Sequence, residues 1–154
     1  MVGNEETVEC LLSNLIKLDY DAVEAYDAAI NRLESEEYKL KLKAFREEQL
    51  AHTRNLGEIL REMKKNVPEG PDLKQILAQG KVVIAHLFGD KAILSAMKTN
   101  MDYTNSAYER ALNHKKITPE VREVLRKNLE DEERHRGWIV EQMRDEEPAK
   151  RIRD

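Results

Sequence analysis

Apolar residues recur at helical spacing along four long segments of this chain, which limits its fold to a bundle of helices. The chain has 154 residues, enough for one compact domain and too few for two comfortable ones. Charged residues make up 36% and hydrophobic residues 40%, with only 6 Gly and 4 Pro, a mix typical of long surface-charged helices rather than sheet. The predicted helices cover residues 5–33, 36–65, 91–112 and 119–144.

Capping residues mark where three of these helices begin. Ser35 stands before two glutamates, an N-cap followed by acidic residues in the first turn. Asp90 follows Gly89 and is the expected cap of the third helix. Thr118 precedes Pro119, which suits the first position of the fourth helix.

The connections between the helices predict how they are wired. Short turns join the first helix to the second and the third to the fourth, so each pair should form an antiparallel hairpin. Residues 66–71 contain two prolines and a glycine that stop the second helix, and we expect residues 72–88 to form a long crossover with one or two short helices. Such a crossover makes the second and third helices parallel; the alternative is an ordinary helical bundle with an irregular linker. We predict one domain over residues 1–147 and a charged, frayed tail over residues 148–154.

Charge and composition bear on partners and location. The net charge is −4 and acidic and basic residues are interleaved, so no basic stripe is available and we expect no nucleic-acid partner. No apolar run is long enough to span a bilayer, and the N-terminus lacks the form of a signal peptide. A single Cys10 excludes an internal disulfide and fits a reducing compartment. We therefore expect a cytoplasmic protein with no membrane contact.

Two short motifs repeat at the same spacing on different predicted helices. Glu132 and His135 are three residues apart, as are Gln49 and His52, and side chains at this spacing lie about 60° apart around a helix. The two motifs are offset by 83 residues (135 − 52), and Tyr26 and Tyr108 by 82 (108 − 26). The pattern predicts a duplicated hairpin with a pseudo-twofold axis through the bundle.

A helical wheel separates the polar residues that face the core from those that face solvent. Asp19 lies near the centre of the first apolar face, whereas Asp21 and Glu24 fall on the far side and are not counted as ligands. Both motifs face inward on their helices, with Glu48 at the edge. On the third helix Met101 is central and Asp102 flanks it.

Taken singly, each inward polar residue is more simply a satisfied core group, but together they need a common explanation. Buried carboxylates without a partner cost several kcal/mol, so such a cluster requires a cation or shared protons. Carboxylate and imidazole are common metal ligands. The candidate metal ligands are Asp19, Gln49, His52, Asp102, Glu132 and His135.

With these motifs in view, the chain resembles the ferritin-like superfamily over residues 8–143, in particular its small bacterial members of unassigned function. The resemblance implies a ferritin-like four-helix bundle in which two helices each give a Glu and two each give Glu-x-x-His, holding two iron or manganese ions. Here Glu132 and His135 match in full, Gln49 and Met101 replace two glutamates, and Asp19 replaces a third. With only Asp19 and Glu132 as certain carboxylates, one divalent ion is better neutralised than two.

Two functions follow from this pattern. The first is a ferritin-like metal-binding protein with a degenerate, one-ion centre for iron, manganese or zinc, connected with iron or oxidative stress. If it is an enzyme, the chemistry would be an oxidase or peroxidase reaction at iron. The alternative is a metal-free helical bundle that acts as an interaction or dimerisation module through an apolar strip on the crossover (Val82, Val83, Ile84, Leu87 and Phe88). We expect a homodimer in either case.

Overall fold

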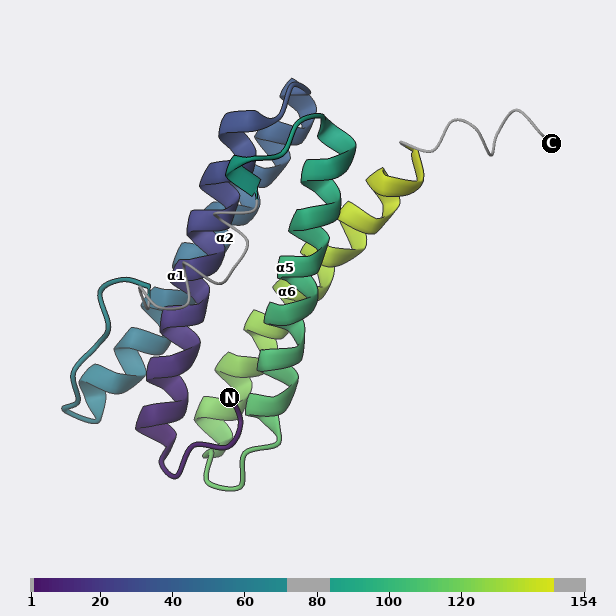
Figure 1. Ribbon diagram of the computed structural model, residues 1–154. Helices are drawn as coiled ribbons and strands as arrows, with labels where there is room; N and C mark the ends of the chain where they lie inside the picture. The colour runs from purple at the N-terminus through teal and green to yellow at the C-terminus, as the bar shows by residue number, and fades with distance from the viewer. Residues whose placement is uncertain (1, 72–83, 146–154) are drawn as a thin grey trace.

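Four long helices form the part of the protein that the structure describes, and no strand occurs in that part. The computed structural model describes residues 2–71 and 84–145. The helices are α1 (Val8–Arg32), α2 (Glu36–Glu62), α5 (Asp90–Leu112) and α6 (Pro119–Asp145). The prediction of an all-α four-helix bundle is confirmed. Figure 1 shows α1 and α2 as one antiparallel hairpin and α5 and α6 as another, with α2 and α5 running in the same direction.

The helix starts follow local capping chemistry, with one correction. Ser35 accepts a hydrogen bond from the Tyr38 amide at 3.2 Å, and Thr118 accepts one from the Val121 amide at 3.3 Å, so both predicted caps are confirmed. The prediction that Asp90 caps the third helix is wrong. Gly89 is the N-cap there, with a φ of 88° and no side-chain bond, and Asp90 is the first helical residue.

The Asp90 carboxylate instead connects the two hairpins. It accepts hydrogen bonds from the backbone amides of Glu34 and Ser35 at 2.8 and 3.0 Å. These amides lie in the turn between α1 and α2, where they have no helical partner. A side chain that sequence alone assigns to a local cap therefore makes a tertiary contact.

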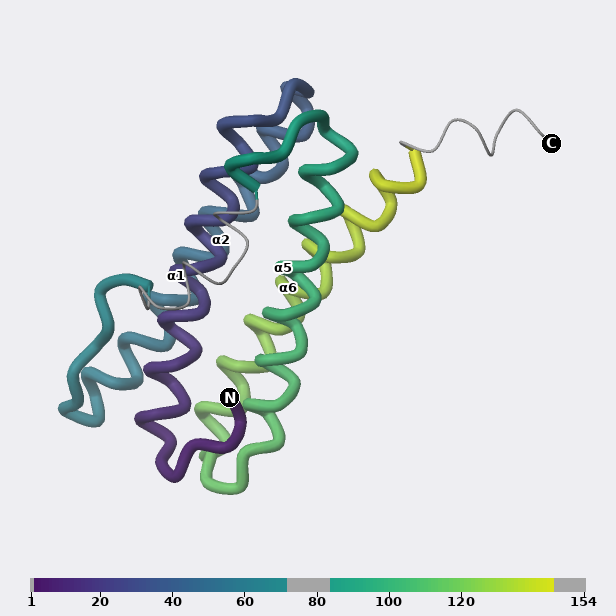
Figure 2. Tube along the Cα trace, in the orientation of Figure 1, coloured from purple at the N-terminus to yellow at the C-terminus, as the bar shows by residue number. Residues whose placement is uncertain are grey.

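Two apolar clusters fill the bundle, with a polar layer between them. One includes Leu15, Leu56 and Leu125, and the other Phe45, Ile93 and Ile139. The apolar residues of each helix belong first to one cluster and then to the other, and the inward polar residues occupy the stretch between. Figure 2 shows the four helical segments running alongside one another along the length of the bundle. The polar layer is therefore enclosed at both ends by packed side chains.

The crossover and the tail lie largely outside the described residues. Residues 72–83 and 148–154 belong to this part, so the short helices expected in the crossover, Val82 and Val83 among them, are not placed. Ile84 is buried in the second apolar cluster, which removes it from the expected exposed strip. Phe88 is 83% exposed, with the Arg32 guanidinium 4.5 Å above its ring. None of the helices described is both long and apolar enough to cross a membrane.

Candidate metal centre

Three side chains from three helices meet in the polar layer. Asp19 of α1, His52 of α2 and Glu132 of α6 each offer one ligand atom, and these atoms all lie within 4.8 Å of one another. All three residues are buried, with at most 1% of their surface exposed. Imidazole nitrogen and carboxylate oxygen are ligands for divalent transition metals. This set could hold one metal ion.

The Asp19 carboxylate is held in place from two sides. Gln49 Nε2 donates to Asp19 Oδ1 at 2.8 Å, and the Tyr108 hydroxyl donates to Oδ2 at 2.7 Å. Asn128 Nδ2 in turn donates to the Tyr108 hydroxyl oxygen at 3.3 Å. These bonds orient Asp19 toward the centre of the bundle through side chains from α2, α5 and α6.

Three polar atoms at this centre are buried without a hydrogen bond. They are Gln49 Oε1, His52 Nδ1 and Glu132 Oε1. His52 Nδ1 lies 3.2 Å from Glu132 Oε1, yet the pair is not aligned as a hydrogen bond. Leaving a buried polar atom unpaired costs about 1–3 kcal/mol, more for a charged group. A cation between these atoms would remove that penalty, so the residues present fit a metal ion.

The outward nitrogens of both histidines bind carboxylates from the opposite helix. His52 Nε2 lies 3.0 Å from Asp131 Oδ2, and His135 Nε2 lies 2.5 Å from Glu48 Oε2. Arg134 Nη2 donates to the second oxygen of each carboxylate, Glu48 Oε1 and Asp131 Oδ1, both at 2.8 Å. One guanidinium thus ties together the two carboxylates that hold the two imidazoles.

These contacts decide which nitrogen of each imidazole faces the core. An ionised carboxylate only accepts hydrogen bonds, so Nε2 of His52 and of His135 must carry a proton. The other nitrogen, Nδ1, is then the one whose lone pair faces inward when the ring is neutral. Carboxylates that orient metal-binding histidines in this way are a general feature of metal sites.

Burial and neighbouring charges shift the pKa values of these groups. Burial raises the pKa of Asp19 to about 7 despite the opposing effect of His52. Burial alone would lower the pKa of His52, but the carboxylates of Glu132, Asp19 and Asp131 outweigh it and raise the pKa to about 9. Burial lowers the pKa of His135 more than Glu132 and Glu48 raise it. In the metal-free protein His52 therefore carries the proton that a metal ion would displace.

Acids outside the core remain ionised. Burial alone would raise the pKa of Glu48, but hydrogen bonds from Arg134 and His135 lower it below the ordinary value. The pKa of Asp131 is lowered in the same way, with burial outweighed by His52 and Arg134. Both carboxylates therefore carry the charge that holds the two imidazoles.

The two other predicted ligands, His135 and Asp102, are not part of this three-residue set. His135 is fully buried, with Nδ1 3.4 Å from the Tyr26 hydroxyl and its ring stacked on Phe45 at 4.1 Å between centroids. Asp102 faces outward, 2.7 Å from Lys98 Nζ and bonded to Arg136 Nε. Burial alone would raise the pKa of Asp102, but these two partners lower it. The structure brings Asp19, Gln49, His52 and Glu132 together and leaves Asp102 apart from them.

Met101 and a small cavity occupy the α5 side of the centre. Met101 is buried, and the cavity beside it is also lined by Gln49, Glu132 and Tyr26. The centre of a water molecule can reach about 10 Å³ of it, which is room for about one water. No carboxylate approaches the centre from α5 in the part of the chain that is described.

Sequence reasoning left out the outer carboxylates and their arginine, although the chain carries a signal for them. Glu48 precedes Gln49 as Asp131 precedes Glu132, at the same offset of 83 residues (131 − 48). A helical wheel puts Glu48 at the edge of the inner face, and the reach of a long side chain brings it to His135. Asp21, which the wheel puts on the outer face, is also buried.

Comparison with known proteins gives one family and no nearer relative. Residues 7–114 match the model of a family described as a domain of unknown function (DUF2383). The match includes Asp19, Gln49 and His52 and ends at the turn before α6, which carries Glu132 and His135. Neither the curated proteins nor the solved structures gave a match.

Proposed function

This chain belongs to the family described as a domain of unknown function (DUF2383), and we propose that it binds one divalent transition-metal ion in the core of its bundle. Asp19, His52 and Glu132 are the proposed ligands. Gln49 positions Asp19 and offers its own carbonyl oxygen, and His135 lies beside the centre. The proposal depends above all on three buried side chains, Asp19, His52 and Glu132, each of which offers a ligand atom within 4.8 Å of those of the other two.

Charge balance supports one ion rather than two. Asp19 and Glu132 supply two negative charges, which neutralise one divalent ion in a region of low dielectric. Two ions would need further carboxylates, but Gln49 and Met101 are uncharged and Asp102 is bound to Lys98 and Arg136. A one-ion centre is the arrangement these side chains fit.

The ligand set narrows the choice of metal. One imidazole and two carboxylates suit Fe²⁺, Mn²⁺ or Zn²⁺, whereas Ca²⁺ and Mg²⁺ prefer oxygen ligands alone. The hairpin pairing and the parallel α2 and α5 are consistent with a ferritin-like bundle, and on that likeness we propose iron as the first metal to test. A bound iron would supply redox chemistry, and a role in iron or oxidative-stress physiology is part of this proposal.

The protein's own residues would bind and orient the ion. Asp131 and Glu48 hold the Nε2 protons of His52 and His135, so that Nδ1 is the inward nitrogen of each ring, facing Glu132 in His52 and the Tyr26 hydroxyl in His135. The two apolar clusters exclude bulk water from both ends of the centre. Tyr26 and Tyr108 are buried beside it, and burial raises the pKa of both phenols, so both remain neutral hydroxyls.

Metal content per chain tests the proposal. Protein purified without chelator, or reconstituted with Fe²⁺, Mn²⁺ or Zn²⁺, is expected to contain one ion per chain by elemental analysis. Asp19→Asn, His52→Gln and Glu132→Gln should each remove most of it, because each substitution removes a ligand charge or the inward Nδ1. Glu133→Gln is the matched control, since Glu133 is the exposed neighbour of Glu132 on the same helix.

The outcomes separate the two functions. Metal that is retained in His52→Gln and Glu132→Gln at the level of the control would refute the proposed centre. Protein that takes up no metal after reconstitution, and whose stability does not change in chelator, would favour the metal-free interaction module. Sedimentation over a range of concentrations would then show whether that module forms the expected homodimer.

A further inference from the structure

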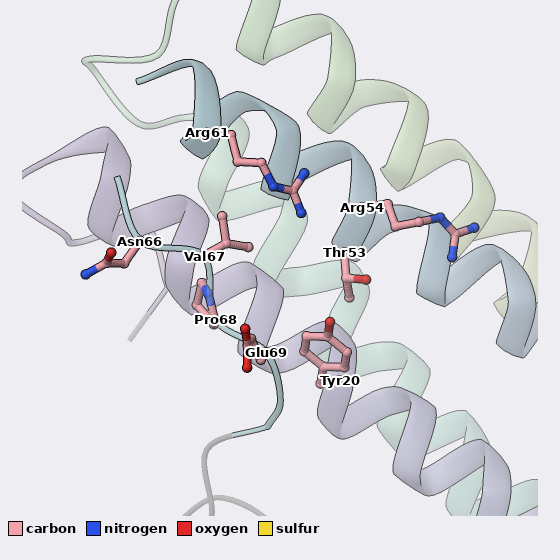
Figure 3. A pocket seen from close by; sticks show the side chains of 8 residues that line it. All are labelled: Tyr20, Thr53, Arg54, Arg61, Asn66, Val67, Pro68 and Glu69. Atoms are coloured by element: carbon pink, nitrogen blue, oxygen red, sulfur yellow. The ribbon is translucent and has the colours of Figure 1, made fainter. Parts of the chain in front are cut away.

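A second pocket lies on the outer side of the first hairpin, away from the metal ligands. It has a volume of about 460 Å³, within the range of small-molecule sites. Tyr20 of α1, Thr53, Arg54 and Arg61 of α2, and the segment after α2 line it. Figure 3 shows Tyr20 projecting toward Thr53, with Val67, Pro68 and Glu69 running alongside.

Two arginines of this pocket have no partner among the described residues. Neither Arg54 nor Arg61 forms an ion pair or hydrogen bond with the portion of the chain that is described. Arginines elsewhere on the bundle surface are engaged, for example Arg46 with Asp27 and Arg126 with Glu123. The pocket therefore presents two guanidinium groups whose donors are not taken up by any residue that the structure describes.

Both arginines of the pocket come from one stretch of α2. Residues 54 and 61 are seven positions apart, so they lie on the same side of the helix about 10 Å apart along its axis. Arg61 turns back over Gly57, where a Cβ would lie 3.7 Å from Arg61 Nη2 and 3.1 Å from Val67 Cγ1. The missing side chain of Gly57 leaves room for both the Arg61 guanidinium and the Val67 side chain.

The second hairpin provides an internal comparison. The predicted duplication pairs Tyr20 with Asp102 (offset 82) and Thr53 with Arg136 (offset 83). At that place between α5 and α6, the Asp102 carboxylate binds both Arg136 and Lys98, so both cations have an anionic partner. In the first hairpin the equivalent residues are an uncharged Tyr and Thr. The first hairpin therefore has no carboxylate at the place that Asp102 occupies in the second, and Glu69 is the one acidic residue among those that line the pocket.

We propose that this pocket binds a small phosphomonoester. The dianionic phosphate group would lie between Arg54 and Arg61, whose two positive charges match its own two negative charges at neutral pH. The Tyr20 hydroxyl is free to donate a further hydrogen bond, and Val67 and Pro68 form an apolar wall for the organic part. Glu69, on the same wall, favours a ligand that also carries an amino group.

Titration of the chelator-treated protein tests this proposal without reference to metal. The probe is O-phosphoethanolamine, which carries both a phosphomonoester and an amine, and binding is followed by calorimetry and by the arginine Nε–Hε resonances. Saturable binding in the millimolar range or tighter is expected. Arg54→Gln and Arg61→Gln should each weaken it about tenfold or more, the usual effect of losing a charge-assisted hydrogen bond. Arg126→Gln is the control, because Arg126 is an exposed arginine outside the pocket.

Two further ligands, inorganic phosphate and acetate, test which groups of the ligand the pocket recognises. Inorganic phosphate should bind more weakly than O-phosphoethanolamine, and Glu69→Gln should reduce that difference. Acetate should bind far more weakly than either, because it carries one charge. Absence of saturable binding, an equal loss in Arg126→Gln, or acetate binding as tight as that of the phosphomonoester would overturn the proposal. Circular dichroism of each variant confirms that the bundle is folded.

Discussion

Removing the charge of one outer carboxylate at a time would show which histidine is a metal ligand. Asp131→Asn keeps an oxygen that can accept from His52 Nε2 but removes the negative charge, and Glu48→Gln does the same at His135. Only His52 belongs to the three-residue centre, whereas His135 Nδ1 faces the Tyr26 hydroxyl. The two substitutions are chemically alike and should have unequal effects on metal affinity.

The expected magnitude follows from how these carboxylates act. Loss of an outer partner of a metal-binding histidine typically lowers metal affinity about 10–100-fold, or about 1.4–2.8 kcal/mol. Asp131→Asn should fall in this range because Asp131 orients His52 directly. It also takes a partner from Arg134, which retains Glu48. Glu48→Gln should change the affinity much less.

Competition with a chromophoric chelator for Zn²⁺ at one fixed pH measures both affinities, with Glu133→Gln as the control. Equal losses in Asp131→Asn and Glu48→Gln would mean that His135 is also a ligand, so the three-residue centre would be wrong. No loss in either variant would refute the view that these carboxylates position the imidazoles at all.

Three further predictions concern stability. In chelator, the free energy of unfolding, measured by urea titration, should fall between pH 7.5 and 9 by at most about 1.4 kcal/mol per pH unit. The reason is that folded His52 keeps its proton up to a pKa of about 9, whereas the unfolded ring loses it near 6.5. His52→Gln should flatten this slope. Phe45→Ala, at a buried ring stacked on His135, should destabilise the protein by about 3–5 kcal/mol in the same assay, and a loss below about 1 kcal/mol would contradict the packing. Asp90→Ala should lower stability by about 1 kcal/mol, since it removes two hydrogen bonds to the α1–α2 turn, and an unchanged melting temperature would show that this link contributes nothing.

The periodicity of the sequence was enough to find the inner polar residues but not their partners. Asp19, His52 and Glu132 sit on apolar faces, and a helical wheel places such residues in the core whatever the details of packing. Asp102 lies at the edge of the apolar face of α5, where charged residues on other turns and helices decide whether its side chain turns into the core. Arg136 on the neighbouring helix and Lys98 one turn away hold it outside.

Contacts between helices were harder to predict, because they depend on how each helix is rotated about its axis and how far it is shifted along its neighbour. Two contacts join α2 to α6, Glu48 to His135 and Asp131 to His52. Both form only when α2 and α6 pack with one particular shift along their axes, and the sequence of either helix alone does not specify that shift. The 83-residue offset between Glu48 and Asp131 is the one trace of this arrangement in the sequence. That offset indicates equivalent positions for Glu48 and Asp131 only once the two hairpins are taken as repeats of each other.

The predicted equivalence of the two hairpins indicates how the centre could be changed from one ion to two. Each hairpin has an uncharged residue at a place where the ferritin-like pattern has a Glu, Gln49 in the first and Met101 in the second. Gln49→Glu with Met101→Glu would raise the buried carboxylates from two to four, which balances two divalent ions. Without metal, the added buried charges should destabilise the bundle by several kcal/mol, so folding should become dependent on metal. Two ions per chain by elemental analysis, with a melting temperature that falls sharply in chelator, is the expected result. One ion per chain with unchanged stability would show that Met101 does not face the centre occupied by Asp19 and Glu132.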